Sequence, residues 1–406
     1  MGATYHALYA LQHRGQESCG MAVNKAGVIT CYKDIGLVNE VFTAEVLAKM
    51  GTGHMAVGHC RYATTGTQSR SNAQPLLIKH LKGSMALTHN GNITNAAELR
   101  ESLEMGGAIF HTTADTEVIA YTITQERIHS DSIEQAVSRA MERIDGAYSI
   151  VLMSPTKVVA ARDPMGFRPL CIGQLDDGFV FASESCALDS IGATFLRDVE
   201  PGEIVVASEK GLTSIAPTCP QKGALCVFEF IYFARPDSVV DGSSVHVARL
   251  RAGAFLALEH PVQADVVIGV PDSGIDAAIG YARQSGIPYG IGFIKNKYIG
   301  RTFIQPTQAQ RVDSVRIKLN TIASTVQGKR VVLVDDSIVR GTTSKRIVYL
   351  LREAGATEVH VRLSAPPFKY PCYFGTDIDS TDHLIAHHHS IEEIRQMIGA
   401  DSLGYL

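Results

Sequence analysis

Val331-Val332-Leu333-Val334 runs into the acidic pair Asp335-Asp336 and then into the loop Ser337-Ile338-Val339-Arg340-Gly341-Thr342-Thr343-Ser344. The four apolar residues are typical of a strand that is buried on both faces, so the two carboxylates are expected at its C-terminal end. A helix is expected over 342–354, closed by Gly355. This strand, loop and helix predict a phosphate site, because a helix N-terminus presents free N–H groups to an anion.

The same alternation of strand and helix recurs on both sides of this stretch. Apolar strands are expected over 264–270, 330–334 and 358–364, and a helix over 272–285, which Gly286 closes. Near-continuous apolar strands that alternate with helices predict an α/β domain whose parallel sheet is covered on both faces. Because such sheets bind ligands at the C-terminal ends of their strands, the acidic pair lies in the predicted site.

The acidic pair also indicates what kind of ligand is bound. Adjacent carboxylates repel each other unless they meet hydroxyl groups or a metal ion, and ribose hydroxyls and Mg²⁺ meet that need. Gly341 lets the backbone turn tightly around a phosphate, and Thr342 and Thr343 add hydroxyl donors. The pattern therefore favours a phosphorylated sugar bound with magnesium. The simpler interpretation is a strand–turn–helix in which the Asp and Thr residues only cap the helix.

Two further segments have anion-binding features. Val270-Pro271-Asp272-Ser273-Gly274 lies between a strand and a helix and predicts a second anion loop, in which Asp272 or Ser273 is also placed to cap the helix. The stretch Lys295–Phe303 is basic, and Arg311, Arg316 and Lys318 continue it. One interpretation of this stretch is a cationic lid over a diphosphate, and the other is a solvated basic surface.

The N-terminal half has a different pattern. Strands are expected over 55–60, 84–89, 148–153, 157–161, 178–183 and 203–207, and helices over 115–125 and from Ser132 onward. Strand pairs without an intervening helix indicate antiparallel sheet, so residues 1–222 are interpreted as an α+β domain and residues 223–406 as the α/β domain. Residues 213–223 hold two prolines and little periodicity, which is typical of a linker.

Composition excludes several classes of function. The chain of 406 residues has a net charge of -4, so no basic excess favours nucleic acid or an acidic membrane surface. No apolar run approaches the length of about 20 residues that spans a bilayer, and the N-terminus lacks the pattern of a secretory signal. The eight cysteines form no CxxC, which is typical of reduced thiols, so a cytoplasmic protein is expected.

His387, His388 and His389 point in different directions and are interpreted as a surface run rather than a metal site.

The loop after Asp335-Asp336 resembles the phosphoribosyl-pyrophosphate (PRPP) signature of type I phosphoribosyltransferases. Three further stretches resemble the amidophosphoribosyltransferases, which are the glutamine-dependent first enzymes of purine synthesis: Tyr232-Phe233-Ala234-Arg235-Pro236-Asp237-Ser238, Lys295–Phe303 and Arg352-Glu353-Ala354-Gly355-Ala356-Thr357-Glu358. The resemblance covers nearly the whole chain. It implies an N-terminal-nucleophile (Ntn) glutaminase domain of αββα architecture, followed by a type I phosphoribosyltransferase domain with a parallel sheet.

The resemblance implies the reaction PRPP + glutamine + H₂O → 5-phosphoribosylamine + glutamate + diphosphate. The acidic pair would hold the ribose hydroxyls or Mg²⁺, and the loop after it would bind the 5-phosphate. The implied PRPP-binding residues are Asp335, Asp336, Ser337, Val339, Arg340, Gly341, Thr342, Thr343, Ser344, Lys295, Lys297, Tyr298 and Arg301, with Ser273, Asp335 and Asp336 as magnesium ligands. The resemblance also implies inhibition by purine nucleotides, an internal ammonia channel and a homo-oligomer, either a dimer or a tetramer.

For glutamine, the resemblance implies a second set of residues. Arg61 would clamp the α-carboxylate, Asp115 would hold the ammonium group, and Thr64 belongs to the same glutamine-binding set. The Asn90 side chain and the Gly91 N–H would form the oxyanion hole. Without the family, Asn90-Gly91 is typical of a turn, Asp115 of a helix cap and Arg61 of a surface ion pair.

The catalytic cysteine of this enzyme class stands at residue 1, where its own α-amine serves as the base. This chain begins with Met1, and Cys19-Gly20 is an internal dipeptide without a free amine. The chain as written is therefore expected to lack normal glutamine hydrolysis, either because its start is truncated or because it uses free ammonia.

The iron–sulfur-containing branch of the family supplies one further expectation. By resemblance to that branch, Cys226 and Cys372 are two of the four thiolates of a [4Fe–4S] cluster, and the other two would lie beyond Leu406. The alternative is that both cysteines are simply buried.

Three narrower functions stay open. An ammonia-dependent phosphoribosylamine synthase would be active with ammonium salt but not with glutamine. A non-catalytic PRPP-binding regulator would release no diphosphate with either nitrogen source. A phosphoribosyltransferase that acts on a free base would leave the glutamine-like N-terminal half unexplained.

Overall fold

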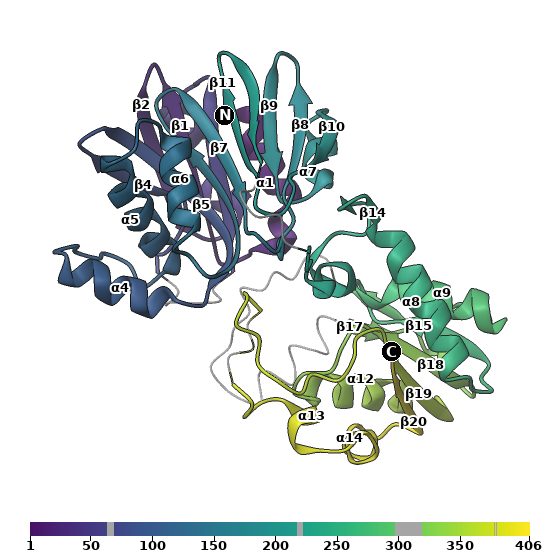
Figure 1. Ribbon diagram of the computed structural model, residues 1–406. Coiled ribbons are helices and arrows are strands. Elements are labelled where there is room, and N and C mark those ends of the chain that lie inside the picture. Colours follow the sequence, from purple (N-terminus) through teal and green to yellow (C-terminus); the bar gives the residue numbers. More distant parts are fainter. Residues whose placement is uncertain (63–68, 217–221, 297–318, 377, 379) are drawn as a thin grey trace. The chain divides into compact units, whose positions relative to one another are not determined.

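The computed structural model describes residues 1–62, 69–216, 222–296, 319–376, 378 and 380–406. The chain forms two compact units, whose elements are labelled in Figure 1. The first unit comprises residues 1–226, 238–242 and 372–377, and the second comprises residues 227–237, 243–371 and 378–406. The chain therefore leaves the first unit after Cys226 and returns to it twice.

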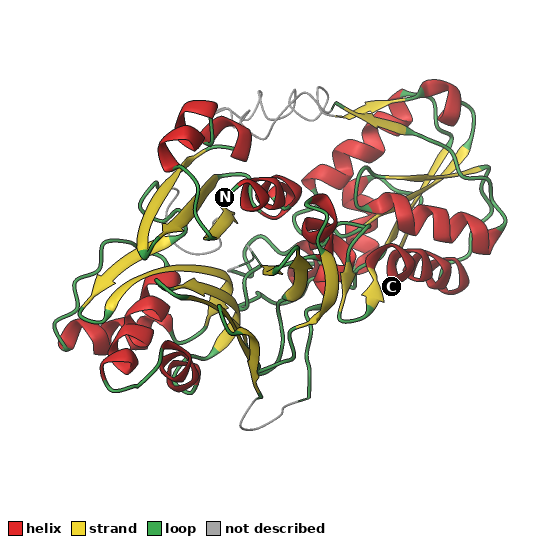
Figure 2. Ribbon diagram, turned by 90° about the horizontal axis from the view of Figure 1, so that it is seen from above, coloured by secondary structure: helices red, strands yellow, loops and turns green. Residues whose placement is uncertain are grey.

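The first unit is built mainly from antiparallel strands, which Figure 2 shows in yellow. Its strands are β1 (Ser18–Lys25), β2 (Val28–Ile35), β3 (Met55–Arg61), β4 (Leu76–His80), β5 (Gly83–Ile93), β6 (Gly146–Met153), β7 (Lys157–Arg162), β8 (Cys171–Leu175), β9 (Gly178–Ala182), β10 (Thr194–Asp198), β11 (Ile204–Ser208), β12 (Gly211–Ile215) and β13 (Val239–Val240). Its helices are α1 (Gly2–Ala10), α2 (Val38–Val41), α3 (Ala44–Met50), α4 (Ala96–Met105), α5 (Asp115–Ile128), α6 (Ile133–Met141) and α7 (Ser185–Ser190), with a short turn of helix over Gln12–Arg14.

Two sheets and two helical layers make up the body of the first unit. The six-stranded sheet has the order β12-β11-β7-β6-β5-β4, and the three-stranded sheet has the order β2-β1-β3. Neighbouring residues of β5 point to opposite faces, so Leu87 packs under Ile119 of α5 while Ala86 packs against Val57 of β3. Helices α1 to α3 cover the outer face of the smaller sheet. This helix–sheet–sheet–helix arrangement confirms the αββα prediction.

The second unit has the α/β architecture that the apolar strands predict. Its elements are a helical turn over Glu229–Phe233, β14 (Ser243–Ser244), α8 (Val245–Glu259), β15 (Val266–Gly269), α9 (Gly274–Ser285), β16 (Phe293–Lys295), β17 (Leu319–Thr321), α11 (Ala323–Val326), β18 (Arg330–Asp335), α12 (Thr342–Glu353), β19 (Glu358–Leu363), α13 (Ile385–His388), α14 (Ile391–Ile398) and β20 (Ser402–Tyr405). The main sheet has the order β15-β18-β19-β20, and all of its pairs are parallel.

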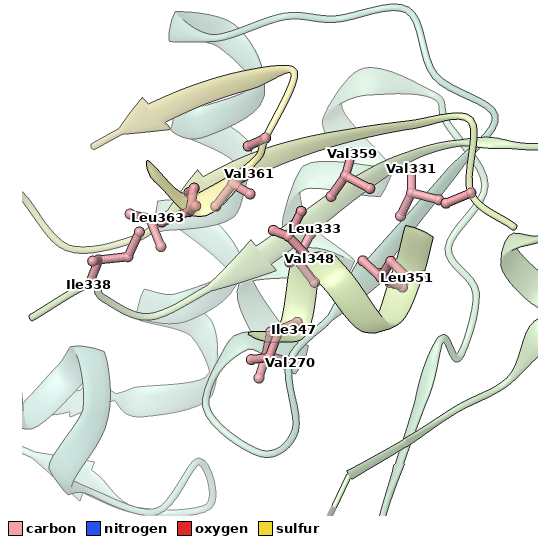
Figure 3. Packing of buried hydrophobic residues seen from close by; sticks show 14 of the residues in the cluster. Val270, Val331, Leu333, Ile338, Ile347, Val348, Leu351, Val359, Val361 and Leu363 are labelled. Atoms are coloured by element: carbon pink, nitrogen blue, oxygen red, sulfur yellow. The ribbon is translucent and has the colours of Figure 1, made fainter. Parts of the chain in front are cut away.

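Both faces of this parallel sheet are buried. Val332 and Val334 pack beneath α8 and α9, whereas Val331 and Leu333 pack with α12 and α14 on the opposite face. Figure 3 shows the second of these clusters, in which Leu351 of α12 lies over the strands. A strand that is covered on both sides is apolar at every position, which is why 331–334 could be recognised from sequence.

The observed elements agree with most of the expected ones and correct others. The linker expected over 213–223 is wrong at its start, because β12 continues to Ile215 and pairs with β11. Ser132 caps α6 as predicted, since its side chain accepts a hydrogen bond from the N–H of Gln135 (3.2 Å). Strands β1, β2, β4, β8, β10, β12 and β20 are among those that were not expected. Within the described ranges, every helix is too short or too polar to span a membrane.

Candidate functional site

The acidic pair stands where three loops meet at the C-terminal edge of the parallel sheet. The N–H of Val270 bonds to the carbonyl of Val334 (2.9 Å), which ties the loop after β15 to β18. On the other side, the N–H groups of Ser364 and Ala365 bond to the carbonyls of Asp335 (3.1 Å) and Asp336 (2.8 Å). The main chain of the pair is thus fixed from both neighbouring strands, as the topology rule for parallel sheets predicts.

The loop after β15 reaches the acidic side chains directly. Ser273 donates its hydroxyl hydrogen to Asp336 Oδ1 (2.6 Å), and Ser337 donates to Asp336 Oδ2 (2.5 Å). Ser273 occupies the N-cap position of α9, but its side chain bonds to Asp336 rather than capping the helix. Gly274 permits this approach, because a Cβ at residue 274 would lie only 2.4 Å from the carbonyl oxygen of Val334.

The electrostatics of the pair favour a cation or a set of hydroxyl donors. Asp335 and Asp336 are 9% and 8% exposed. Burial, and then the neighbouring Asp336, raise the pKa of Asp335 well above its usual value. Four carboxylate oxygens at a strand end are hard ligands of the kind that Mg²⁺ binds, so these residues fit a magnesium ion.

The turn that follows the pair has the geometry of an anion loop. Gly341 has φ +78°, a left-handed conformation that favours glycine, and it is the N-cap residue of α12. Thr342 and Thr343 are exposed at the start of the helix, whereas Ser344 is buried. Free N–H groups and two exposed hydroxyls therefore lie together in the first turn of α12.

The basic stretch is described only at its beginning. Lys295 ends β16, and its ammonium group lies 2.5 Å from Asp272 Oδ2 in the loop after β15. Both side chains are exposed. Lys297, Tyr298 and Arg301, together with Thr64 of the glutamine set, lie outside the described residues.

The predicted oxyanion-hole residues lie on β5, beside β6. Gly91 has φ +140°, and a Cβ there would lie 2.0 Å from the carbonyl oxygen of Ala147, so only glycine fits. Within the described part of the chain, the buried Asn90 Nδ2 has no hydrogen-bond partner. A buried amide N–H₂ group that lacks an acceptor is suited to receive a negatively charged oxygen.

The two charged residues of the glutamine set approach the same strand. Asp115 starts α5, and its Oδ2 accepts a hydrogen bond from the N–H of Ile93 (3.2 Å), while its Oδ1 lies 3.7 Å from His89 Nδ1. Burial raises the pKa of Asp115, but the contacts with His89 and Ile93 outweigh it, so the net pKa is lowered and the carboxylate stays ionised. Arg61, at the end of β3, is buried and lies close enough to Asp115 for the two charges to interact.

The internal cysteine that imitates a nucleophile is not suited to that role. Cys19 is fully buried in β1 and packs with Met21 under α2. Burial, followed by the charges of Glu40 and Asp34, raises the pKa of its thiol to about 12. A thiol that stays protonated at neutral pH is a poor nucleophile.

Cys226 and Cys372, the two cysteines expected to bind a cluster, both belong to the first unit and are connected through Phe167. The N–H of Cys226 bonds to the carbonyl of Phe167 (3.1 Å), and the ring of Phe167 stacks on Phe374, two residues after Cys372. However, no group of three or more Cys, His, Asp or Glu side chains suited to a metal occurs among the residues that the structure describes. A [4Fe–4S] cluster takes four thiolates, so the described residues by themselves do not support one.

Two supporting residues were missed from sequence. Gln74 accepts a hydrogen bond from the N–H of His89 (2.7 Å) and donates to Thr116 Oγ1 (3.0 Å), so it links β5 to α5 beside the oxyanion-hole residues. The buried Glu184 bonds to Arg14 (2.6 Å) and to Ser238 (2.7 Å), which come from distant parts of the chain. Neither residue belongs to a recognisable motif, because their partners become neighbours only through folding.

Known protein families match each half of the chain. Residues 59–190 match the family model of the glutamine amidotransferase domain, and residues 245–366 match that of the phosphoribosyl transferase domain. The first range holds Arg61, Asn90 and Asp115, and the second holds the acidic pair and its two loops. The architecture is therefore a glutamine amidotransferase domain followed by a phosphoribosyltransferase domain.

Relatives match the chain over nearly its whole length. The amidophosphoribosyltransferase of Bacillus subtilis (strain 168) is 51% identical over 404 residues, which cover 99% of this chain and 84% of the relative. That of Archaeoglobus fulgidus is 49% identical over 402 residues, covering 99% of this chain and 88% of the relative. A solved structure of the B. subtilis glutamine PRPP amidotransferase with ADP and GMP superposes with a TM-score of 0.93 at 50% identity, covering 100% of this chain and 88% of that one.

Proposed function

Because the chain belongs to the amidophosphoribosyltransferase family, whose reaction is the first step of purine biosynthesis, we propose that it converts PRPP, glutamine and water to 5-phosphoribosylamine, glutamate and diphosphate. One observation carries the proposal for the PRPP half: Asp335 and Asp336 stand between the Ser273 loop and the Gly341 turn. That arrangement offers carboxylates, hydroxyls and free helix N–H groups to one ligand, which a phosphorylated ribose requires.

In the proposed PRPP complex, each part of the site has one task. Asp335 and Asp336 hold the ribose hydroxyls or Mg²⁺, and Val339 to Ser344 bind the 5-phosphate at the start of α12. Ser273 helps to hold Mg²⁺ and the diphosphate. Asp335, Asp336 and Ser273 would hold a Mg²⁺ ion of the kind that phosphoribosyltransferases generally use, and the ion would supply positive charge against the leaving diphosphate. Lys295, with Lys297, Tyr298 and Arg301, would add positive charge and exclude water, which competes with ammonia for the same carbon.

In the proposed glutamine complex, Arg61 binds the α-carboxylate, Asp115 the ammonium group, and Thr64 completes the set. The unpartnered Nδ2 of Asn90 and the N–H of Gly91 would stabilise the oxyanion. A second candidate function uses free ammonia in place of glutamine. The burial of Cys19 in β1 favours this candidate, because it makes the internal cysteine a poor nucleophile.

Several finer features are proposed with the activity. The glutamine amidotransferase domain would span residues 1–222 and the transferase domain residues 223–406. Purine nucleotides would inhibit, as the ADP and GMP in the B. subtilis complex suggest for that relative. A homo-oligomer, a dimer or tetramer, is proposed from the family. The absence of any CxxC among the eight cysteines of the sequence supports a cytoplasmic location. Cys226 and Cys372 stay proposed as part of an iron–sulfur site, to be tested by iron and sulfide analysis.

One experiment tests the PRPP half and separates the two nitrogen sources. Purified chain would be titrated with PRPP in the presence and absence of Mg²⁺ by calorimetry, and diphosphate release would be measured with glutamine or with ammonium salt. We expect magnesium-dependent binding that is lost when Asp335 and Asp336 are both replaced by alanine. Release with ammonium salt alone supports the second candidate. Binding that survives the double replacement would show that the acidic pair is not the PRPP site.

A further inference from the structure

We propose that His59 on β3 accepts a hydrogen bond from the amide N–H₂ group of bound glutamine and so distinguishes glutamine from glutamate. The inference rests on the proposed glutamine complex and adds a specificity-determining residue to it. All of the residues involved belong to the first unit and lie on β3 and β5.

The side chain of His59 lies in the layer between the two sheets of the first unit. Side chains alternate along a strand, so His59 shares one face of β3 with Val57 and Arg61. Val57 packs with Ala86 of β5, which places this face against the larger sheet. The opposite face of β3 is covered by α1. His59 is therefore directed toward β5, the strand that carries the proposed oxyanion-hole residues.

Asn90 reaches the same layer from the larger sheet. Ala86 and Asn90 are four residues apart on β5, so both point to the face that meets β3. The His59 ring hydrogen-bonds to the main chain of His89, the residue before Asn90, and the charge of Arg61 also acts on the ring. His59 therefore adjoins both the residue proposed to bind the α-carboxylate and the residue proposed to bind the oxyanion.

One ring nitrogen of His59 is left for a ligand. Within the described residues, the buried Nδ1 has no hydrogen-bond partner. Burial, followed by the charges of His89 and Arg61, lowers the pKa of His59 to about 3, so the ring is neutral at physiological pH. The bond to the main chain of His89 opposes this shift, as a ring N–H that donates to a carbonyl does. Because Nδ1 has no partner, that donor is Nε2, and Nδ1 keeps its lone pair.

Two buried atoms of opposite kind are therefore unpartnered in this layer, since Asn90 Nδ2 is a donor and His59 Nδ1 is an acceptor. A primary carboxamide has the matching pair, because its oxygen accepts and its N–H₂ group donates. A carboxylate has acceptors only, so glutamate would set an oxygen lone pair against that of Nδ1. A site of this kind rejects an analogue that lacks the donor, because a buried group is then left unpaired.

Calorimetry with L-glutamine and L-glutamate tests the assignment on the full chain. The unmodified chain should bind glutamine at least about 100-fold more tightly than glutamate. His59→Leu removes the acceptor and should weaken glutamine binding about tenfold or more, while glutamate binding changes less than about threefold. His59→Asn places an amide oxygen near the position of Nδ1 and should restore most of the preference. His54→Leu is the matched control, since this exposed histidine precedes β3, and it should leave both affinities unchanged.

Two calorimetric results would overturn the inference. An equal loss of affinity for both ligands in His59→Leu would show a structural role only, and unchanged glutamine binding in that variant would show that Nδ1 is not used. If the unmodified chain binds no glutamine, the proposed glutamine complex fails and the inference fails with it.

A spectroscopic measurement covers the case in which His59→Leu does not fold. In nitrogen NMR of the unmodified chain with labelled histidine, the His59 signals are identified by their absence from the spectrum of His59→Asn. The Nδ1 signal should be that of an unprotonated nitrogen, and it should shift with glutamine but not with glutamate. A protonated Nδ1, or an unshifted signal while glutamine binds, contradicts the inference.

Discussion

Gly274→Ala should disable PRPP binding through a steric effect that can be worked out from the structure. A Cβ at residue 274 would lie 2.4 Å from the carbonyl oxygen of Val334 and 3.1 Å from Asp335 Cα. Since favourable contacts lie at about 3.5 Å or more, the loop that carries Ser273 would have to withdraw by about 1 Å. A misplacement of about 1 Å can cost about 100-fold in activity, and overpacking costs about 1–3 kcal/mol of stability.

The assay pairs this variant with Gly286→Ala at the other end of the same helix, α9. Gly286 has φ +74° with no atom within 4 Å of a Cβ, so alanine there costs about 1–2 kcal/mol of backbone strain and touches nothing. Urea unfolding should show a comparable loss of stability in both variants. Calorimetry with PRPP and Mg²⁺ should show about 100-fold weaker binding for Gly274→Ala alone. Normal affinity in Gly274→Ala, or an equal loss in both, would refute the reasoning.

Three further predictions follow from buried ionisable groups. Burial and Asp336 raise the pKa of Asp335, so its contribution to stability is full below about pH 4 and is lost as the pH rises through the folded-state pKa. Asp335→Asn should remove this dependence when urea unfolding is compared with the unmodified chain across pH. Glu184→Ala should destabilise the first unit by about 3 kcal/mol in urea unfolding, because His13, Arg14 and Ser238 would all lose the buried carboxylate that they contact. Cys19→Ala should leave diphosphate release with either nitrogen source unchanged in the enzyme assay, and any selective loss with glutamine would contradict the assignment of Cys19 as a core residue.

Much of the second unit could be predicted because its signals are local. The run 331–334 is apolar at every position, since both faces of β18 are covered, and Gly341 has the left-handed conformation that its place in the loop predicts. The parallel order of the sheet followed from the alternation of strands and helices. Strand β20 was missed because Ser402–Tyr405 is short and at the edge of the sheet, where its neighbour supplies most of the stabilising contacts.

The glutamine site was less accessible to sequence reasoning, because its parts are brought together by folding. Asn90 and Gly91 form a common turn dipeptide, yet the structure places them in an extended strand, where Gly91 meets the main chain of Ala147. No spacing rule relates Gln74 to Thr116 or Asp115 to Ile93, although both contacts position this region. The family resemblance identified these residues, and the contacts give the physical reason for them.

The first unit is made of three separate stretches of the chain, which affects its folding during synthesis and the choice of fragments for expression. Arg162 is almost completely buried, and its guanidinium forms two hydrogen bonds (2.8 and 2.9 Å) with Asp241, which lies beyond the first 226 residues. A recombinant fragment cut after Cys226 would lack the carboxylate that is bonded to this cation, at a cost of up to about 3–5 kcal/mol. The nascent amidotransferase half therefore lacks this bonded carboxylate until later codons are translated, and an expression boundary drawn at the apparent linker would remove it.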